Sequence, residues 1–293
     1  MKLDALTIPT MSRINAIPKT FRAASLFAGC GGSSTGYKLA GVDILYANEF
    51  VEEARRVYRL NHPTTKLDKR DVREVTGASI MKALGIKPGE LDILDGSPPC
   101  SSFSTAGAGS KGWGKEKKYS TGKVQSTDDL YFEYVRLLGE LKPKMFVSEN
   151  VPGLASGAAK GYYLDILEGL EAAGYVVKAK ILNAADFGVP QSRRRLLTVG
   201  IRKDLAKKHK LEVSFPKPAF DKHLSVGDLF PHIAYMRATK DGRKQFVPAV
   251  GPYPTITASD GLSSLTANFS CGGWVETQKG EIRKFTLDEL RVI

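Results

Sequence analysis

Short apolar runs alternate with helical segments through the first 201 residues, and this alternation restricts the possible folds more than any other feature. Runs of strand length lie at 23–27, 44–47, 91–94, 145–148, 176–182 and 196–201. The segments between them have helical spacing or length, at 35–40, 51–60, 78–84, 128–141 and 163–173. Such alternation is typical of βαβ units. It predicts an α/β fold, with a Rossmann-like, mostly parallel sheet and helices on both faces.

The pattern changes after Ile201. Prolines become frequent, periodicity weakens, and between 202 and 250 basic residues outnumber acidic ones by more than two to one. We therefore expect a large domain at 1–201 and a small, irregular second domain at 202–270. A last segment at 271–293 is expected to return to the first domain.

The amino-acid composition indicates which partners the chain can bind and whether it can form disulfides or a metal site. The net charge of +12 favours a polyanion such as nucleic acid, although an acidic membrane surface or a generally basic protein would also fit. The three cysteines are far apart, without a CxxC pair or a histidine cluster, which argues against disulfides and a metal site. No apolar stretch approaches the ~18 residues that span a bilayer, so we expect a soluble, cytoplasmic protein.

A glycine-rich turn, Phe-Ala-Gly-Cys-Gly-Gly at 27–32, follows the first apolar run. Such a turn lets backbone amides approach a nucleotide-like ligand, and Glu49 follows the next run, where an acidic group can bind ribose hydroxyls. Ser34 replaces the third glycine of a dinucleotide motif, and Asp71 with Val72 could bind adenine. An adenosine ligand without a pyrophosphate, such as S-adenosylmethionine, therefore fits better than NAD.

Three further strand ends carry reactive side chains. Pro98 and Pro99 follow the run at 91–94 and present Cys100, either as a nucleophilic thiol or as a structural cysteine in a turn. Glu149 follows the run at 145–148, and would face the crevice of Cys100 if the two strands are neighbours. Gln-Ser-Arg-Arg-Arg at 191–195 opens another strand, as an exposed basic edge or as a pair of guanidiniums aimed at one anion.

These motifs, in this order, resemble those of the cytosine-C5 DNA methyltransferases. The resemblance covers about residues 23–201 and returns weakly at 254–257 and 283–289. It implies that the Cys100 thiolate adds to C6 of a flipped cytosine, so that C5 takes a methyl group from S-adenosylmethionine and leaves S-adenosylhomocysteine. Glu149 matches the acid at N3 and the exocyclic amine, and Arg195, with Arg193, matches the arginines that bind O2.

The resemblance also implies partners and a cofactor site. The partner is double-stranded DNA, with a lysine-rich loop at 101–125 on its phosphates, a target recognition domain at 202–270 and restriction–modification as the setting. The implied cofactor residues are Phe27, Ala28, Gly29, Cys30, Gly31, Gly32, Glu49, Phe50, Asp71, Val72, Pro99 and Leu130.

Two departures from the family pattern stand out. Ser101 occupies the usual place of a glutamine, and the chain ends before a last Gly-Asn-x-Val-Pro-like motif. A clipped or split chain completed by a second one, a degenerate enzyme, and a permuted order with the motif at 14–18 are the three interpretations. Unless a second chain supplies the missing motif, we expect the protein to be a monomer.

Other functions compete with DNA methylation. The tRNA-methylating branch of the family shares the chemistry, and the basic segment after Ile201 favours DNA. A non-catalytic DNA-binding module would not bind the cofactor. A nicotinamide oxidoreductase would have no use for Cys100 and Glu149 together.

Overall fold

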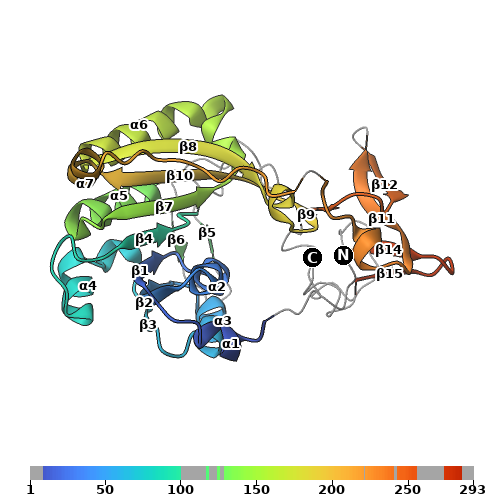
Figure 1. Cartoon of the computed structure of the whole chain (residues 1–293), viewed down its shortest axis with the longest axis horizontal. Helices are drawn as coiled ribbons and strands as arrows, with labels where there is room; N and C mark the ends of the chain where they lie inside the picture. The colour runs from blue at the N-terminus through green and yellow to red at the C-terminus, as the bar shows by residue number, and fades with distance from the viewer. Residues whose placement is uncertain are drawn as a thin grey trace. The chain divides into compact units, whose positions relative to one another are not determined.

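The computed structural model describes residues 9–99, 117–118, 124–125, 129–220, 222–240, 243–255 and 274–285 (Figure 1). The chain forms two compact units. The larger unit consists of Pro9–Ile181 and Arg195–Phe215, and the smaller one of Met1–Ile8, Leu182–Arg194 and Pro216–Ile293.

A seven-stranded sheet is the centre of the larger unit. In spatial order its strands are β3 (Lys66–Asp68), β2 (Val42–Asn48), β1 (Phe21–Leu26), β4 (Ile93–Gly96), β7 (Met145–Asn150), β10 (Arg194–Arg202) and β8 (Tyr175–Asn183). The first five strands run parallel, and β10 is antiparallel to β7. The predicted Rossmann-like, mostly parallel sheet is confirmed.

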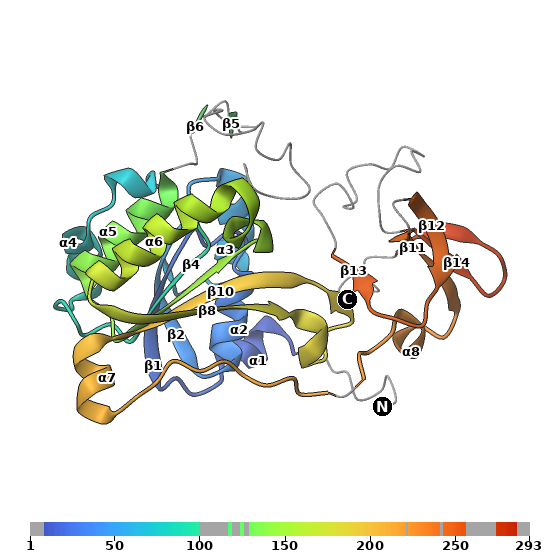
Figure 2. The same ribbon diagram turned by 90° about the horizontal axis from the view of Figure 1, so that it is seen from above.

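Helices cover both faces of this sheet (Figures 1 and 2). Ala24, Leu26 and Leu94 point to the face where α4 (Gly77–Leu84), α5 (Leu130–Leu141) and α6 (Lys160–Ala172) pack. Their neighbours Ala23 and Ile93 point to the other face, which α2 (Gly32–Leu39) and α3 (Glu52–Asn61) cover. The alternation of side chains along each strand therefore builds two cores, one on each face.

The helix after the glycine-rich turn begins earlier than predicted. We expected it from residue 35, but α2 starts at Gly32 because Gly31 adopts φ 90° and caps the helix. Before β1, the short helix α1 (Met11–Asn15) buries Ile14, and Asn15 Oδ1 accepts a hydrogen bond from Lys38 Nζ of α2.

The smaller unit contains a four-stranded sheet with its own core. The sheet order is β12 (Arg243–Pro248), β11 (Ile233–Lys240), β14 (Trp274–Thr277) and β15 (Ile282–Lys284). Helix α8 (Val226–Leu229) belongs to the same unit, as does the β9 (Gln191–Ser192) and β13 (Tyr253–Pro254) pair. Its core includes Phe230, Tyr253, Val275 and Phe285.

The boundaries of these two units differ from those of the predicted domains. Helix α7 (Lys203–His209) belongs to the larger unit because Lys203 N donates to the carbonyl of Gly174. Strand β14 pairs with β11, so residues 274–284 lie in the sheet of the smaller unit. A pair of two-residue strands, β5 (Lys117–Lys118) and β6 (Val124–Gln125), completes the described strands. Within the described ranges, none of the helices is long and apolar enough to cross a membrane.

Candidate cofactor pocket and active site

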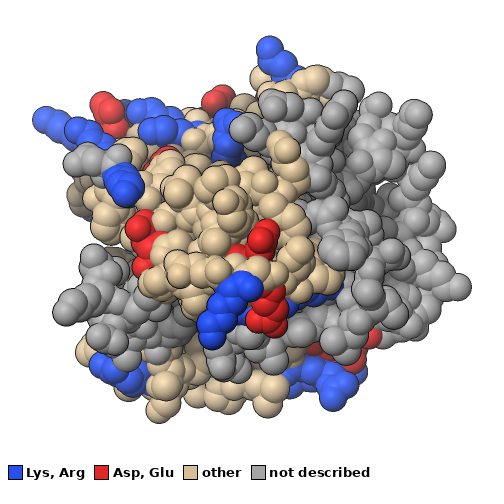
Figure 3. Space-filling view, turned by 90° about the vertical axis from the view of Figure 1, so that its right-hand side faces the viewer, with Lys and Arg blue, Asp and Glu red and all other residues tan. Residues whose placement is uncertain are grey.

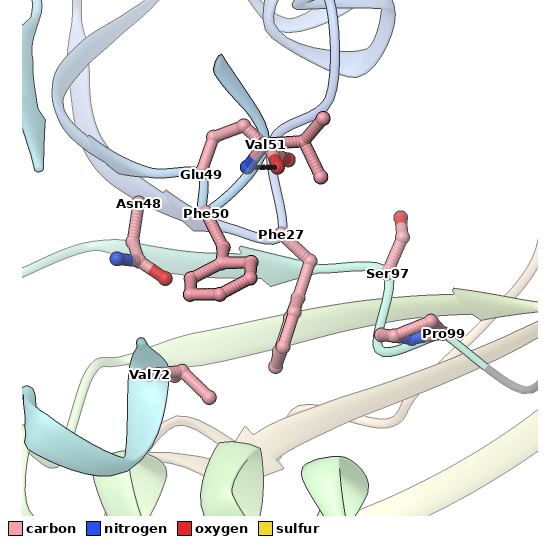
Figure 4. Close-up of a pocket in the computed structure, with 8 residues that line it drawn as sticks. All are labelled: Phe27, Asn48, Glu49, Phe50, Val51, Val72, Ser97 and Pro99. Atoms are coloured by element: carbon pink, nitrogen blue, oxygen red, sulfur yellow. Dashed lines mark hydrogen bonds between the residues drawn. The ribbon is translucent and has the colours of Figure 1, made fainter. Parts of the chain in front are cut away.

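A pocket lies at the carboxyl ends of β1, β2 and β4, and it encloses about 190 Å³ (Figure 4). The chain runs from β1 outward to β2 and β3 and then crosses back to β4, so β1 is where the strand order reverses. Open α/β sheets bind their ligands at such a point. The lining residues are Phe27, Asn48, Glu49, Phe50, Val51, Val72, Ser97 and Pro99.

Glu49 holds the glycine-rich turn against the second strand. Its side chain is almost buried, and Oε2 accepts a hydrogen bond of 2.8 Å from the amide of Gly29. Oε1 accepts one of 2.7 Å from the amide of Val51, drawn as a dashed line in Figure 4. Each oxygen keeps a second lone pair, so the carboxylate is fixed in place and can still accept hydrogen bonds from ligand hydroxyls.

The turn itself requires glycine. Gly29 and Gly31 have φ of 56° and 90°, in the left-handed region that glycine adopts readily. A Cβ on Gly31 would lie 2.4 Å from Nε2 of His62. Burial lowers the pKa of His62, and the neutral imidazole donates from Nε2 to the carbonyl of Gly31 at 3.0 Å. His62 therefore stabilises the turn through its hydrogen bond to Gly31.

The remaining predicted turn residues are Ala28, Cys30 and Gly32. The amide of Ala28 donates to the carbonyl of Asn48, Cys30 is exposed, and Gly32 is the first residue of α2. None of the three is among the eight lining residues of the described pocket.

Apolar side chains form the far side of the pocket. The rings of Phe27 and Phe50 and the side chain of Val72 surround the same space in Figure 4. Phe27 has φ 56°, which is uncommon for a bulky side chain and costs about 1–3 kcal/mol in strain. Such strain is typical of a functional site. The pocket thus combines a fixed carboxylate with flat apolar walls, a combination that suits an adenosine group.

Asp71 and Leu130 contribute indirectly. Asp71 Oδ1 accepts a hydrogen bond of 3.0 Å from the amide of Arg73 and caps the 3₁₀-helix η2 (Val72–Glu74), which carries Val72. Leu130 is buried in the same core as Val72. Three lining residues were not predicted: Asn48, Val51 and Ser97. Each lies beside or within two residues of a predicted one, so strand-end position was the available signal.

The strand that ends beside the predicted acid and the strand that precedes the predicted thiol are neighbours, so the condition set in the sequence analysis is met. Gly96 of β4 pairs with Ser148 of β7. Nδ2 of Asn150 donates a hydrogen bond of 3.0 Å to the carbonyl of Pro98. Cys100 lies outside the described residues, but the turn that leads to it is joined to the residue after Glu149.

Glu149 forms an ion pair with Arg195. The distance from Arg195 Nε to Glu149 Oε1 is 2.8 Å, and the two side chains are 22% and 32% exposed. The antiparallel pairing of β7 and β10 brings them together, since Glu149 lies opposite Leu197. Both groups remain accessible to a ligand. Arg193 belongs to the smaller unit, where its carbonyl accepts a hydrogen bond from the amide of Ala184.

In Figure 3 much of the described surface is uncharged, and Lys and Arg lie in separate groups, some of them beside Asp or Glu. The described residues on that face form no continuous basic patch.

Comparison with known proteins agrees with this geometry. The family profile described as C-5 cytosine-specific DNA methylase matches residues 21–286. The Type II methyltransferase M.NgoPII of Neisseria gonorrhoeae is 34% identical over 206 residues, which cover 69% of this chain and 54% of the relative. M.FnuDI of Fusobacterium nucleatum is 37% identical over 198 residues, covering 68% and 51%.

A solved structure also matches. It is described as a DNA modification methyltransferase encoded within an E. coli prophage, with 25% identity and a TM-score of 0.59 over 75% of this chain and 59% of that one. The chain spans about half the length of the two curated relatives. The predicted family resemblance is confirmed: this chain belongs to the C-5 cytosine-specific DNA methylase family.

Proposed function

We propose that this chain transfers a methyl group from S-adenosylmethionine to C5 of cytosine in DNA. The observation that carries the proposal is the accessible Glu149–Arg195 pair, held beside the turn that leads to Cys100. An acid, a guanidinium and a thiol at adjacent strand ends can bind one face of a pyrimidine and attack it. Family membership makes cytosine the base.

Each side chain has a defined task in this reaction. The Cys100 thiolate adds to C6, and the electron pair of the C5–C6 double bond becomes available at C5. Glu149 engages N3 and the exocyclic amine, which stabilises the adduct as it forms, and Arg195, with Arg193, binds O2. After C5 has been methylated, a base removes the C5 proton, the double bond re-forms, and Cys100 leaves.

The cofactor pocket fits an adenosine group on this chain's own contacts. Glu49 is oriented by two backbone amides and would accept the ribose hydroxyls, while Phe27, Phe50 and Val72 would enclose the adenine. Gly29 and Gly31 let the turn pass close to the methionine part. S-adenosylmethionine, when bound, supplies the methyl group.

The substrate is double-stranded DNA, read by a monomer. Cytosine C6 is inaccessible inside a duplex, so the base must flip out to meet Cys100. The smaller unit would be the target recognition domain, and the lysines at 101–125 would contact phosphates. The separate core of the smaller unit supports this division of labour, because a folded unit of its own can vary in sequence without disturbing the sheet.

Labelled S-adenosylmethionine tests the proposal. The purified chain is expected to label cytosine C5 in mixed-sequence DNA, and bisulfite sequencing will then show the sequence context. Cys100→Ser should abolish transfer and retain binding of S-adenosylhomocysteine in calorimetry. Transfer to tRNA in place of DNA would identify the tRNA-methylating branch, and binding of DNA without cofactor binding would identify a non-catalytic module.

A further inference from the structure

Asp95 is a buried carboxylate that three hydroxyl groups bind. Its Oδ2 accepts hydrogen bonds from Ser25 Oγ at 2.7 Å and Ser33 Oγ at 3.0 Å, and its Oδ1 accepts one from the hydroxyl of Tyr37 at 3.3 Å. The residue is 3% exposed. None of the sequence motifs gives Asp95 a role.

These donors connect three elements. Asp95 lies in β4 and Ser25 in β1, directly opposite it in the register. Ser33 and Tyr37 lie one turn apart on α2, whose first residue is also the last residue of the glycine-rich turn. One carboxylate therefore links the helix that follows the glycine turn to β4, and the segment after β4 carries the lining residues Ser97 and Pro99.

Folding stability alone does not explain why this buried position carries a carboxylate. The pKa of Asp95 is raised to about 6, because burial and the charge of Glu149 raise it more than the hydroxyl hydrogen bonds lower it. The titratable groups that face it are Tyr37 of α2, Tyr58 of α3, Tyr134 of α5 and Glu149 of β7. A buried anion that only neutral hydroxyls bind is unfavourable for stability, and a neutral side chain of the same shape would avoid this.

We propose that Asp95 is a positioning residue for the cofactor pocket, which sets the distance between the glycine-rich turn and the end of β4. The inference rests on the proposed function, because it concerns the same pocket. Only the ionised carboxylate can accept from all three hydroxyls with both oxygens. An amide or a protonated carboxyl replaces acceptor sites with a donor, so α2 loses part of its connection to β4.

Asp95→Asn tests this with nearly unchanged shape. The Kd for S-adenosylhomocysteine, measured by calorimetry at pH 7.5, is expected to rise about tenfold, as for the loss of a hydrogen bond to a charged group. The melting temperature at the same pH should not fall, since a buried charge is removed. A purely structural role would lower the melting temperature and leave the affinity unchanged.

Two variants on α2 separate positioning from a local effect. Ser33→Ala and Tyr37→Phe each remove one donor from the helix, and each should weaken S-adenosylhomocysteine binding several-fold. Combined with Asp95→Asn, they should add little, because the connection is already lost. Full additivity of the two losses would overturn the proposal.

Asp92→Asn is the matched control. Asp92 precedes the same strand at its other end, where its carboxylate accepts from the amide of Arg22 at 2.7 Å and from Lys144 Nζ at 2.6 Å. Its substitution should leave the cofactor affinity unchanged. An equal loss of affinity in both variants would overturn the positioning role, since it would show a general effect of strand β4.

The pH profile completes the test. Wild-type affinity for S-adenosylhomocysteine should fall as the pH drops through about 6, and that of Asp95→Asn should be flat between pH 5 and 7.5. If the wild-type chain binds S-adenosylhomocysteine and the Kd of Asp95→Asn is within twofold of the wild-type Kd, this inference is overturned and the proposed function is not. A wild-type chain that binds no S-adenosylhomocysteine would overturn the proposed function as well.

Discussion

The side-chain amide of Asn150 donates a hydrogen bond of 3.0 Å to the carbonyl of Pro98. The two residues are 52 positions apart in the sequence: Asn150 is the last residue of β7, and Pro98 follows the adjacent strand β4. The bond fixes the turn that precedes Cys100 relative to the strand end that carries Glu149. Asn150 is buried, so water does not readily replace the bond.

Asn150→Ala should therefore impair chemistry more than cofactor binding. We expect the single-turnover rate of methyl transfer to fall about 10–100-fold, as when a reacting group is misplaced by a fraction of an ångström to one ångström. The Kd for S-adenosylhomocysteine should be unchanged. Gln278→Ala is the control, because Gln278 Nε2 also donates to a proline carbonyl, that of Pro231, at an exposed position. An unaltered rate in the Asn150 variant would refute the positioning argument.

Glu149→Gln should abolish activity with little effect on stability. The Glu149–Arg195 pair is partly exposed, so its loss should change the free energy of unfolding by less than about 1 kcal/mol. Methyl transfer should fall about 100-fold or more, since the acid that stabilises the adduct is missing. Glu133→Gln, which breaks the similarly exposed pair with Arg136, should leave transfer unchanged. Transfer assays and urea unfolding of both variants separate the two effects.

Gly31→Ala and Gly32→Ala should differ sharply in stability. At Gly31 the new Cβ would meet His62 and the backbone has φ 90°, so we expect a loss of at least about 2 kcal/mol. At Gly32 no atom lies within 4 Å of the new Cβ, and alanine favours the helix, so stability should be equal or higher. Urea unfolding of the two variants measures the difference, and equal midpoints would contradict it.

Phe27→Gly should be more stable than Phe27→Ala by about 1 kcal/mol. Both variants lose the ring, but only glycine relieves the strain of φ 56°. Phe50, whose φ is not positive, should show the usual order, with alanine more stable than glycine. All four variants should bind S-adenosylhomocysteine more weakly, because both rings line the pocket. Thermal unfolding measures the order within each pair.

Stability should fall as the pH rises from about 4 to 6 through the ionisation of Asp95. The native carboxyl retains its proton up to about pH 6, whereas an unfolded aspartate releases it near 3.9, so the native state binds more protons in this window. The stabilisation is complete below about pH 4 and absent above about pH 6, and amounts to about 3 kcal/mol. Urea unfolding of wild type and Asp95→Asn should converge at pH 4 and diverge at pH 7.5, with the variant more stable. A constant difference would refute this assignment.

The sequence by itself determined the mostly parallel sheet and the family. These follow from local patterns: apolar runs of strand length, helical spacing, and glycine or proline at strand ends. Glu49 and Val72 were predicted as cofactor residues from their position after strands, and Phe27, Phe50 and Pro99 from the family resemblance; all five line the pocket. The order of the motifs along the chain identified the family.

The division into units depended on tertiary structure. Residues 182–194 join the smaller unit and α7 stays with the larger one, although composition changes at residue 201. Hydrogen bonds such as that from Lys203 N to the carbonyl of Gly174 decide this, and they connect segments whose own patterns are weak.

Only the tertiary structure decided which distant side chains support the site. Ser25 lies 70 residues from Asp95, Asn150 lies 52 from Pro98, and His62 lies 31 from Gly31. Each contact depends on strand order and register, which bring together positions that have no regular spacing along the chain. The physical reason is that a hydrogen bond needs its two groups within about 3 Å, and local sequence patterns do not determine that distance for residues so far apart.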